Sequence, residues 1–494
     1  MKIKAIITSI ALLTSMTFTA PVVQAADELY VPIPSYRVGP YAVGGTGYFG
    51  GILDYYNLLN MRDGGVNGMK LVWSECETEY SVERGVECYK RLKDNKGGAV
   101  FFDPLSVGIS TALIETGRKD KMPIIAVNHG KTAGQRGDVF PYYFMPGINT
   151  YDEHSIMMHF IGDVLEGDRS KLKGKKIAML FHGSPYGREA IMFMDMMCKK
   201  HGCEHTAIEV PHPGNEQQSQ WLKIRKMKPD YVLLRGWGVM NPVAMQTAVR
   251  TGFSVGRLIG NIWSNSDGDV IPAGDAAEGY YAITTHPAGR VAKVIDDIVA
   301  TVYKAGKGDL ADKSRIGSVY WNLGVLAGVF HTEALKTAQD RFGPKVNSAQ
   351  VRWGFENLRL DKSALDALGA TGLVPEINIT CMDHVGGHLA KFQQWDAGKR
   401  QWKVASDWIE GDVALSQAII DEGAEKYAAD NGIKKRDCNN EEDRDNFDLY
   451  SSVFVVLKGD IYLSPFFLSS IQGNTWVLIP SSFNSFKSFF EAIP

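Results

Sequence analysis

The chain has 494 residues, of which 45% are hydrophobic, and its formal net charge is −3. At about 150 residues per domain, this length allows two or three hydrophobic cores. Lysine and arginine are scattered along the sequence. Their distribution excludes the clustered basic face of a nucleic-acid-binding protein.

The first 25 residues have the pattern of a secretory signal peptide. Lys2 and Lys4 precede the apolar stretch Ala5–Phe18, and Val23-Gln24-Ala25 is a small-residue cleavage pattern. The apolar stretch is shorter than the roughly 20 residues of a spanning helix, which disfavours a retained anchor. We expect cleavage after this pattern and export to the periplasm. Because Ala26 and not cysteine follows the cut, a free product is favoured over a lipid-anchored one.

The region 26–146 alternates short apolar runs with amphipathic segments, which is typical of strand–helix–strand units and a parallel sheet. The expected strands are 28–34, 70–74, 99–103 and 123–128. The expected helices are 47–62, 82–93 and 110–119.

A second series of the same kind follows. Its expected helices are 152–165, 188–201, 217–227 and 242–251, and its expected strands are 176–181, 206–210, 231–234 and 258–263. Two consecutive parallel-sheet lobes predict a cleft between them. Ligands in such folds bind beyond the carboxyl ends of the strands.

The pattern changes after Gly279. We expect helices at 291–304, 319–340, 351–358 and 415–431, and a hairpin at 390–408. Trp395 and Trp402 flank the turn of that hairpin. The segment 439–494 holds eight of the 22 phenylalanines and does not continue the preceding alternation of expected strands and helices. It is interpreted as an accessory extension or a reading-frame artefact, with an extra strand pair as the alternative.

Six cysteines fit an oxidising compartment. Sequence proximity suggests disulfides between Cys76 and Cys88 and between Cys198 and Cys203, which leaves Cys381 and Cys438 as the third pair. Other pairings are compatible with the sequence alone.

A glycine-rich motif, Gly45-Thr46-Gly47-Tyr48-Phe49-Gly50, lies between the first expected strand and helix. Its spacing matches G-x-G-x-x-G, which in a dehydrogenase holds a pyrophosphate. Glycine is abundant and an exported protein meets little dinucleotide, so we favour a different ligand. Free N–H groups at this helix start are expected to hold a carboxylate or another anion.

Neither a metal site nor a catalytic set is favoured. Cys198, His201, Cys203 and His205 are zinc-type ligands, but a tight disulfide explains the two cysteines better. The segment His182–Gly187 lacks the spacing of a nucleophile elbow. We therefore expect no metal, no cofactor and no enzymatic activity.

Aromatic side chains gather where expected strands end, which favours an aromatic-lined pocket over isolated core residues. They are Tyr36, Tyr41, Tyr186, Trp237 and Trp263. The polar candidates at the same ends are Ser106, His129, Lys131 and Arg235. For each polar residue alone, an ordinary solvated loop is an equal alternative.

Several segments, in this order and spacing, resemble the periplasmic substrate-binding proteins of ABC transporters, branched-chain amino acid type. The resemblance covers about residues 28–438. The segments that carry it are Tyr36–Tyr41, Arg62–Gly68, Ser184–Gly187, Lys228–Val232 and Gly274–Gly279.

The resemblance implies a type I periplasmic binding fold, in which two α/β lobes are joined by three crossovers. Lobe 1 would comprise 26–146 and 280–372, and lobe 2 would comprise 147–279 and 373–438. The lobes of this family close about a hinge when ligand binds. Relatives of this kind end near Cys438, so the segment 439–494 is an atypical extension.

The resemblance also implies a ligand site. A hydroxyl and backbone N–H groups at Leu105-Ser106 and His129-Gly130-Lys131 would hold a ligand carboxylate. Aromatic positions of the family match Tyr186 and Trp237, and Tyr41, which follows the first strand, is a further candidate. Amino-acid binders place an acid where this chain has Trp263 or Ser264, although Asp267 and Asp269 are near. Without that acid, an α-amino acid is disfavoured and an aromatic or apolar acid is favoured.

These observations predict a monomeric binding protein that delivers a small, carboxylated, partly aromatic ligand to an inner-membrane ABC permease. A ligand-sensing receptor of the same fold is the alternative, and a nicotinamide-dependent oxidoreductase is the less favoured one.

Overall fold

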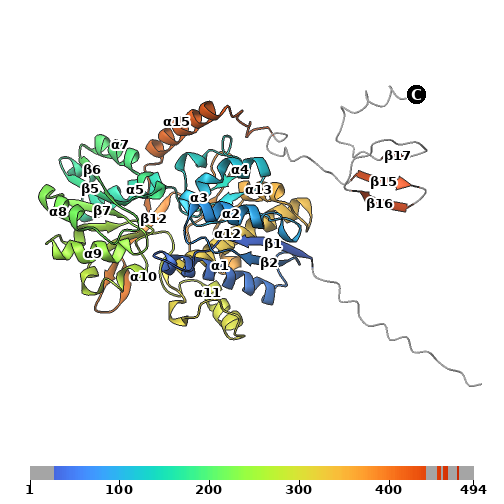
Figure 1. The fold of residues 1–494 in the computed structure, drawn as a ribbon, viewed down its shortest axis with the longest axis horizontal. Helices are drawn as coiled ribbons and strands as arrows, with labels where there is room; N and C mark the ends of the chain where they lie inside the picture. The colour runs from blue at the N-terminus through green and yellow to red at the C-terminus, as the bar shows by residue number, and fades with distance from the viewer. Residues whose placement is uncertain (1–26, 441–452, 458–459, 465–475, 478–494) are drawn as a thin grey trace, which may run out of the picture.

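The computed structural model describes residues 27–440 and three strands further on, 453–457, 460–464 and 476–477. The predicted signal peptide lies outside the described residues. Two α/β groups lie side by side in Figure 1, one mainly green and one mainly blue and yellow. Helix α15 (Val413–Asn431) lies across the top of both. The predicted α/β class is confirmed.

The first sheet is assembled from short parallel segments. Strand β1 (Glu28–Ile33) pairs with β2 (Lys70–Glu75), and β3 (Ile124–Ile125) pairs with β4 (Tyr143–Phe144). Single bridges from Tyr30 to Ala99 and from Phe102 to Ile124 connect these pairs into one layer. The helices of this part are α1 (Ala42–Arg62), α2 (Val82–Leu92), α3 (Val107–Ala112) and α4 (Ile114–Asp120).

The second sheet has the strand order β13-β12-β9-β8-β7-β5-β6, with β14 also paired to β12. Its parallel strands are β5 (Lys176–His182), β6 (Glu204–Val210), β7 (Tyr231–Arg235), β8 (Leu258–Gly260) and β9 (Tyr281–Thr284). Its antiparallel strands are β12 (Leu389–Asp396), β13 (Gln401–Val404) and β14 (Ile409–Glu410). The helices around it are α5 (Thr150–His159), α6 (Pro185–Arg188), α7 (Ile191–His201), α8 (Gln218–Met227), α9 (Met240–Arg250) and α10 (Asp267–Val270).

The predicted hairpin is confirmed, with Trp395 opposite Trp402. Between β9 and β12 the chain returns to the first group, so it crosses between the groups three times. This returning part holds α11 (Lys293–Ile298), α12 (Val319–Phe342), α13 (Ser348–Glu356), β10 (Arg359–Leu360), α14 (Lys362–Leu368) and β11 (Ile377–Asn378). Helix α15 (Val413–Asn431) follows the hairpin. The exact lobe boundaries stay a prediction, and β9 extends the second sheet slightly past residue 279.

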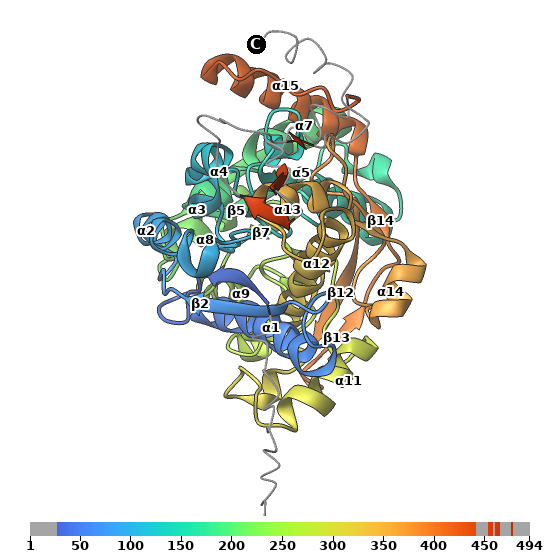
Figure 2. The same cartoon turned by 90° about the vertical axis from the view of Figure 1, so that its right-hand side faces the viewer.

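Helices α1 and α12 pack tightly along each other, and the second view shows them together beneath α13 (Figure 2). Glycines on both helices make this contact possible, and one of them, Gly47, belongs to the predicted anion-binding motif. A Cβ at Gly47 or Gly51 would collide with α12 around Tyr320 and Trp321, and a Cβ at Gly324 would collide with α1.

The expectation of an anion site at the glycine motif is therefore corrected. Helix α1 begins at Ala42, and the Gly45 N–H already donates to the Tyr41 carbonyl (3.1 Å). The motif thus lies inside a helix, where its N–H groups are used by the helix itself. The same correction removes the structural basis for a pyrophosphate-binding loop.

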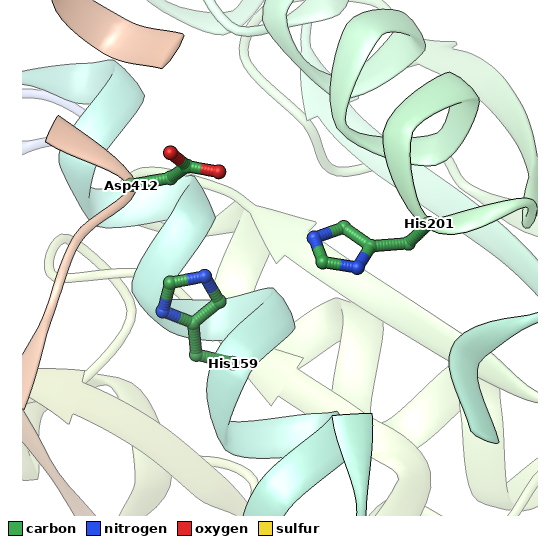
Figure 3. A group of neighbouring side chains, drawn as sticks. All are labelled: His159, His201 and Asp412. Carbon is green, nitrogen blue, oxygen red and sulfur yellow. The ribbon is translucent and has the colours of Figure 1, made fainter. Parts of the chain in front are cut away.

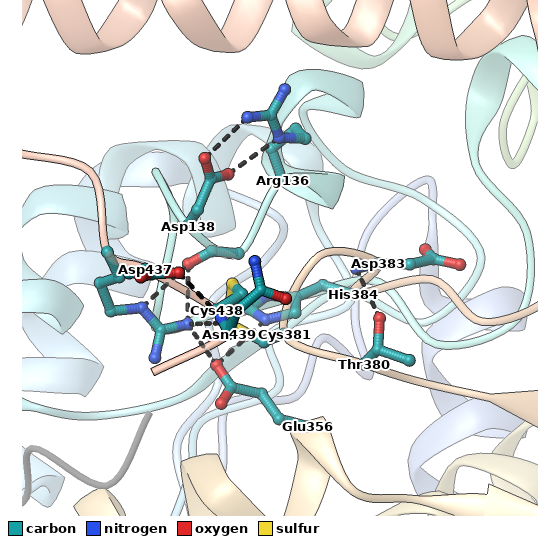
Figure 4. Close-up of a disulfide and its surroundings, with 12 residues drawn as sticks. Arg136, Asp138, Glu356, Thr380, Cys381, Asp383, His384, Asp437, Cys438 and Asn439 are labelled. Carbon is teal, nitrogen blue, oxygen red and sulfur yellow. Dashed lines mark hydrogen bonds and ion pairs between the residues drawn. A yellow bond between two sulfur atoms is a disulfide. The ribbon is translucent and has the colours of Figure 1, made fainter. Parts of the chain in front are cut away.

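Three disulfides join Cys76 to Cys88, Cys198 to Cys203 and Cys381 to Cys438, as predicted. The third disulfide lies beside Glu356 (Figure 4). The Glu356 carboxylate pairs with Arg436, which is close to Cys438 in the sequence. Among the described residues, every helix is too short or too polar to cross a membrane. Strands β15 (Val453–Leu457), β16 (Asp460–Ser464) and β17 (Trp476–Val477) form a separate antiparallel sheet, and the rest of the segment 441–494 lies outside the described residues.

Candidate functional site

A small cavity of about 10 Å³, roughly the space of one water molecule, lies between the two sheets. Side chains from both groups line it, each shortly after a strand or at the start of a helix. The space is narrow, so an organic ligand requires the two groups to separate and close again. The lining residues are Tyr80, Leu105, Ser106, Val107, His129, Tyr186, Trp237 and Trp263.

The first-sheet wall is shaped by a turn at Leu105 and Ser106. Leu105 has a left-handed backbone (φ 43°), and its carbonyl accepts a hydrogen bond from the buried Tyr36 hydroxyl (3.1 Å). Ser106 caps α3 by accepting from the Ile109 N–H (3.3 Å). The cap uses one lone pair of the Ser106 hydroxyl, and the same hydroxyl interacts with Tyr80, which also lines the cavity.

The second-sheet wall is aromatic. The rings of Trp237 and Trp263 meet edge to face with centroids 5.3 Å apart. Across the gap, Trp237 stacks on Tyr41 (6.3 Å) and meets Tyr320 edge to face (5.4 Å). A Cβ at Gly44 would overlap the Trp237 indole, so this glycine admits the ring against the start of α1.

Two ring nitrogens in the lining are buried without a hydrogen-bond partner among the described residues, His129 Nε2 and Trp237 Nε1. The His129 Nδ1–H donates to the Val127 carbonyl (2.7 Å), which leaves Nε2 as an acceptor in the neutral ring. Burial lowers the pKa of His129 and favours that neutral form. Because a buried polar atom without a partner is costly, both nitrogens are candidate ligand contacts.

The Tyr186 side chain is held in place by residues that do not line the cavity. Its hydroxyl donates to the Gly236 carbonyl (3.0 Å), and the Arg235 guanidinium lies 4.3 Å from its ring centroid. Arg235 in turn forms an ion pair with Glu153 (2.9 Å), and the other Glu153 oxygen accepts from the Ile262 N–H (2.8 Å). Arg235 therefore supports the wall and is not part of the lining.

Three predicted site residues do not line the cavity. Tyr41 lies one layer further out, where its hydroxyl is 2.8 Å from His182 Nε2. The Lys131 backbone N–H donates to the Tyr143 hydroxyl (2.9 Å), and its ammonium lies over the Tyr427 ring on α15. Gly130 has φ 124°, and a Cβ there would meet Tyr143, so it serves the turn.

The acids near the cavity also lie outside its lining. Asp269 is buried and accepts from the Tyr320 hydroxyl (2.7 Å) and from Asn241 (2.9 Å). Burial raises the pKa of Asp269 to about 7, and burial also raises the pKa of Asp267. Ser264, the alternative to Trp263, is turned toward Asn261 (2.7 Å). No carboxylate is present among the eight lining residues.

Tyr80 and Val107 were missed from the sequence. Tyr80 has φ 63°, and its ring lies 5.2 Å from Tyr36 and 4.6 Å from Tyr41. It follows β2 within a few residues, so the rule that selected aromatic residues at strand ends also applies to it. Val107 directly follows Ser106 as the first residue of α3.

The two walls are also joined by direct hydrogen bonds. The Thr132 N–H donates to Glu189 Oε1 (2.7 Å). Tyr320 donates to the Trp263 carbonyl (2.8 Å). The two walls are therefore in direct contact beside the cavity.

The sequence profile described as "periplasmic binding protein" matches residues 28–400. No curated protein shows a significant sequence match. Among solved structures, one described as an ABC transporter permease from the Pseudomonas fluorescens group is 42% identical, with a TM-score of 0.78 over 84% of this chain and 100% of that one.

Two more distant structures share the fold. A branched-chain amino acid ABC transporter protein from Thermus thermophilus with bound valine is 19% identical, with a TM-score of 0.66 over 80% of this chain and 99% of that one. A solute-binding protein from R. palustris in complex with benzoate is 16% identical, with a TM-score of 0.61 over 78% of this chain and 98% of that one.

Proposed function

Because this chain belongs to the periplasmic binding protein family, we propose that it is the exported solute-binding component of an ABC importer. The observation that carries the proposal is a cavity lined by residues from both sheets. A ligand that contacts both walls only when they meet favours the closed form. The closed form then presents the ligand to an inner-membrane permease.

The proposed ligand is a small, carboxylated and partly aromatic or apolar molecule. Trp237, Trp263 and Tyr186 supply ring surface, whereas the Ser106 hydroxyl and the Trp237 N–H supply donors for an acid. The lining has no carboxylate to pair an ammonium group, and an unpaired buried charge costs several kcal/mol. Proteins of the same fold bind benzoate in one solved structure and valine in another, so the choice of ligand class rests on the lining residues and not on the fold.

His129 links the binding of an acid to proton uptake. In the closed site its pKa is lowered, chiefly by burial. Nearby Asp103 opposes this effect and nearby Arg235 adds to it. A bound carboxylate would raise the His129 pKa and convert Nε2 from an acceptor into a donor. Affinity for an acid should therefore rise as the pH falls, with at most one proton taken up for each ligand bound.

A thermal-shift screen of aromatic acids, aliphatic acids, amino acids and amides tests the ligand class. A ligand at 100 times its dissociation constant stabilises the protein by about 2.7 kcal/mol. Aromatic acids should give the largest rise in Tm, and small-angle scattering should show compaction with the same compound. A response to amino acids alone would overturn the ligand class, and a rigid profile with every compound would overturn binding by closure.

The proposal also includes the predicted division of the chain. Lobe 1 would hold 26–146 and 280–372, lobe 2 would hold 147–279 and 373–438, and the protein would act as a monomer after cleavage at residue 25. N-terminal sequencing of the periplasmic product tests the cleavage site. Light scattering with and without ligand tests the monomeric state.

A further inference from the structure

Two histidines and an aspartate from distant parts of the chain meet away from the cavity (Figure 3). His159 is the last residue of α5, His201 is the last residue of α7, and Asp412 immediately precedes α15. One ligand atom from each lies within 4.8 Å of the other two. In Figure 3 the two imidazoles and the carboxylate surround a common space.

Both imidazoles have a free, buried nitrogen. The His159 Nδ1–H donates to the Glu410 carbonyl (2.9 Å), which fixes the ring with Nε2 as the lone-pair nitrogen. The Nε2 atoms of His159 and His201 are both buried without a partner among the described residues. Burial lowers the pKa of each histidine and favours the neutral form that metals require. A backbone carbonyl behind a histidine is the usual support of a metal ligand.

The third ligand and the second histidine are held in place. The Asp412 N–H donates to the Ser155 hydroxyl (2.7 Å), and its carboxylate caps α15 through the Leu415 N–H (3.3 Å). His201 lies between Cys198 and Cys203, whose disulfide fixes the end of α7 and removes both thiols as competing ligands. The cation that competes for the carboxylate is Lys200, which forms an ion pair with it.

We propose that His159, His201 and Asp412 form a binding site for a divalent transition metal ion of the zinc type. Two neutral imidazoles and one carboxylate are a common three-ligand set for zinc, with water in the fourth position. Zinc bonds of about 2.0–2.2 Å require the three side chains to move together by roughly 1 Å. A bound ion would tie the start of α15 to the ends of α5 and α7. The proposal is independent of the ligand cavity.

Competition with a chromophoric chelator tests the site, with zinc added to the EDTA-treated full-length protein. We expect one tight equivalent of zinc and a rise in Tm on its addition. His159→Gln and His201→Gln should each weaken that equivalent at least tenfold. Asp412→Asn keeps a good helix cap and should weaken it as well, so loss of α15 is not the cause. Circular dichroism and melting of each variant without metal verify folding.

Two matched variants complete the test. His205→Gln removes a neighbouring histidine that is bonded to Asp195 (2.7 Å) and should leave zinc affinity unchanged. Lys200→Gln removes the competing ammonium and should strengthen binding severalfold. The proposal is overturned if the wild-type protein binds no zinc, or if the three ligand variants bind it as tightly as the wild type does.

Discussion

The two walls of the cavity are built on different principles. The first-sheet wall presents polar atoms that backbone turns hold in place, namely the Ser106 hydroxyl at the start of α3 and the His129 ring tied to Val127. The second-sheet wall presents aromatic rings that other side chains support, as Arg235 and Glu153 support Tyr186. The polar wall is suited to binding the charged group of a ligand, whereas the aromatic wall is suited to packing against its apolar part.

The aromatic wall should depend most strongly on its buried ion pair. Arg235 and Glu153 have side chains only 1% and 3% exposed. Glu153→Gln leaves the guanidinium charge without its counterion and should lower the free energy of unfolding by about 3–5 kcal/mol. Urea denaturation measures this loss. The exposed pair Arg188–Glu209 is the control, and Glu209→Gln should cost no more than about 1 kcal/mol. Equal losses would show that the wall does not depend on the pair.

Ring surface should contribute most of the ligand affinity. Trp237→Ala should weaken binding of the tightest acid in the screen by about 1–3 kcal/mol, because it removes a buried aromatic contact. Trp237→Phe keeps a ring but loses the N–H, so calorimetry of the pair separates the two contributions. Unchanged affinity in the alanine variant would remove Trp237 from the binding site.

The polar wall should carry the pH dependence. Acid binding to the wild-type protein should strengthen as the pH falls from about 8 towards 6, because His129 takes up a proton as the anion enters. His129→Gln should abolish this trend and weaken binding by about 1–2 kcal/mol. Calorimetry in buffers of different ionisation enthalpy measures the proton directly. A trend that survives in the variant would assign the titration to another group.

The smallest effect is expected at Ser106. Ser106→Ala removes the cap of α3 and should cost about 1 kcal/mol of stability. A loss of acid affinity in this variant would measure the contribution of the contact between the Ser106 hydroxyl and the ligand. Ser106→Asn restores a capping side chain and serves as the comparison in both denaturation and binding. Full affinity in the alanine variant would show that the hydroxyl does not contact the ligand.

Much of the fold follows from alternation in the sequence, and so do the residues at strand ends. The hairpin around Trp395 and Trp402 and the disulfides Cys76–Cys88 and Cys198–Cys203 were predicted because each depends on local spacing, and Cys381–Cys438 followed as the remaining pair. Lys131 was predicted to contact the ligand, but its backbone N–H donates to the Tyr143 hydroxyl. The sequence does not reveal this contact. The glycines of α1 were misassigned for a related reason, since a close helix contact and a phosphate loop require the same residue.

The cluster of His159, His201 and Asp412 shows where such reasoning ends. Its members share no local pattern and come together only because the ends of α5 and α7 meet the start of α15 in the folded chain. Proximity in the sequence pointed to Cys198 and Cys203 as partners of His201, and the disulfide excludes them as thiolate ligands.

The cluster of rings around Trp237 gives the protein an optical signal of its own. Tyr41 immediately precedes α1 and Tyr320 lies in α12, and these two helices pack closely through their glycines, whereas the indole belongs to the opposite wall. Parting of the walls would withdraw both tyrosines at once and wet the indole. Its emission should then shift to longer wavelength, so stopped-flow fluorescence can time each opening without any attached dye.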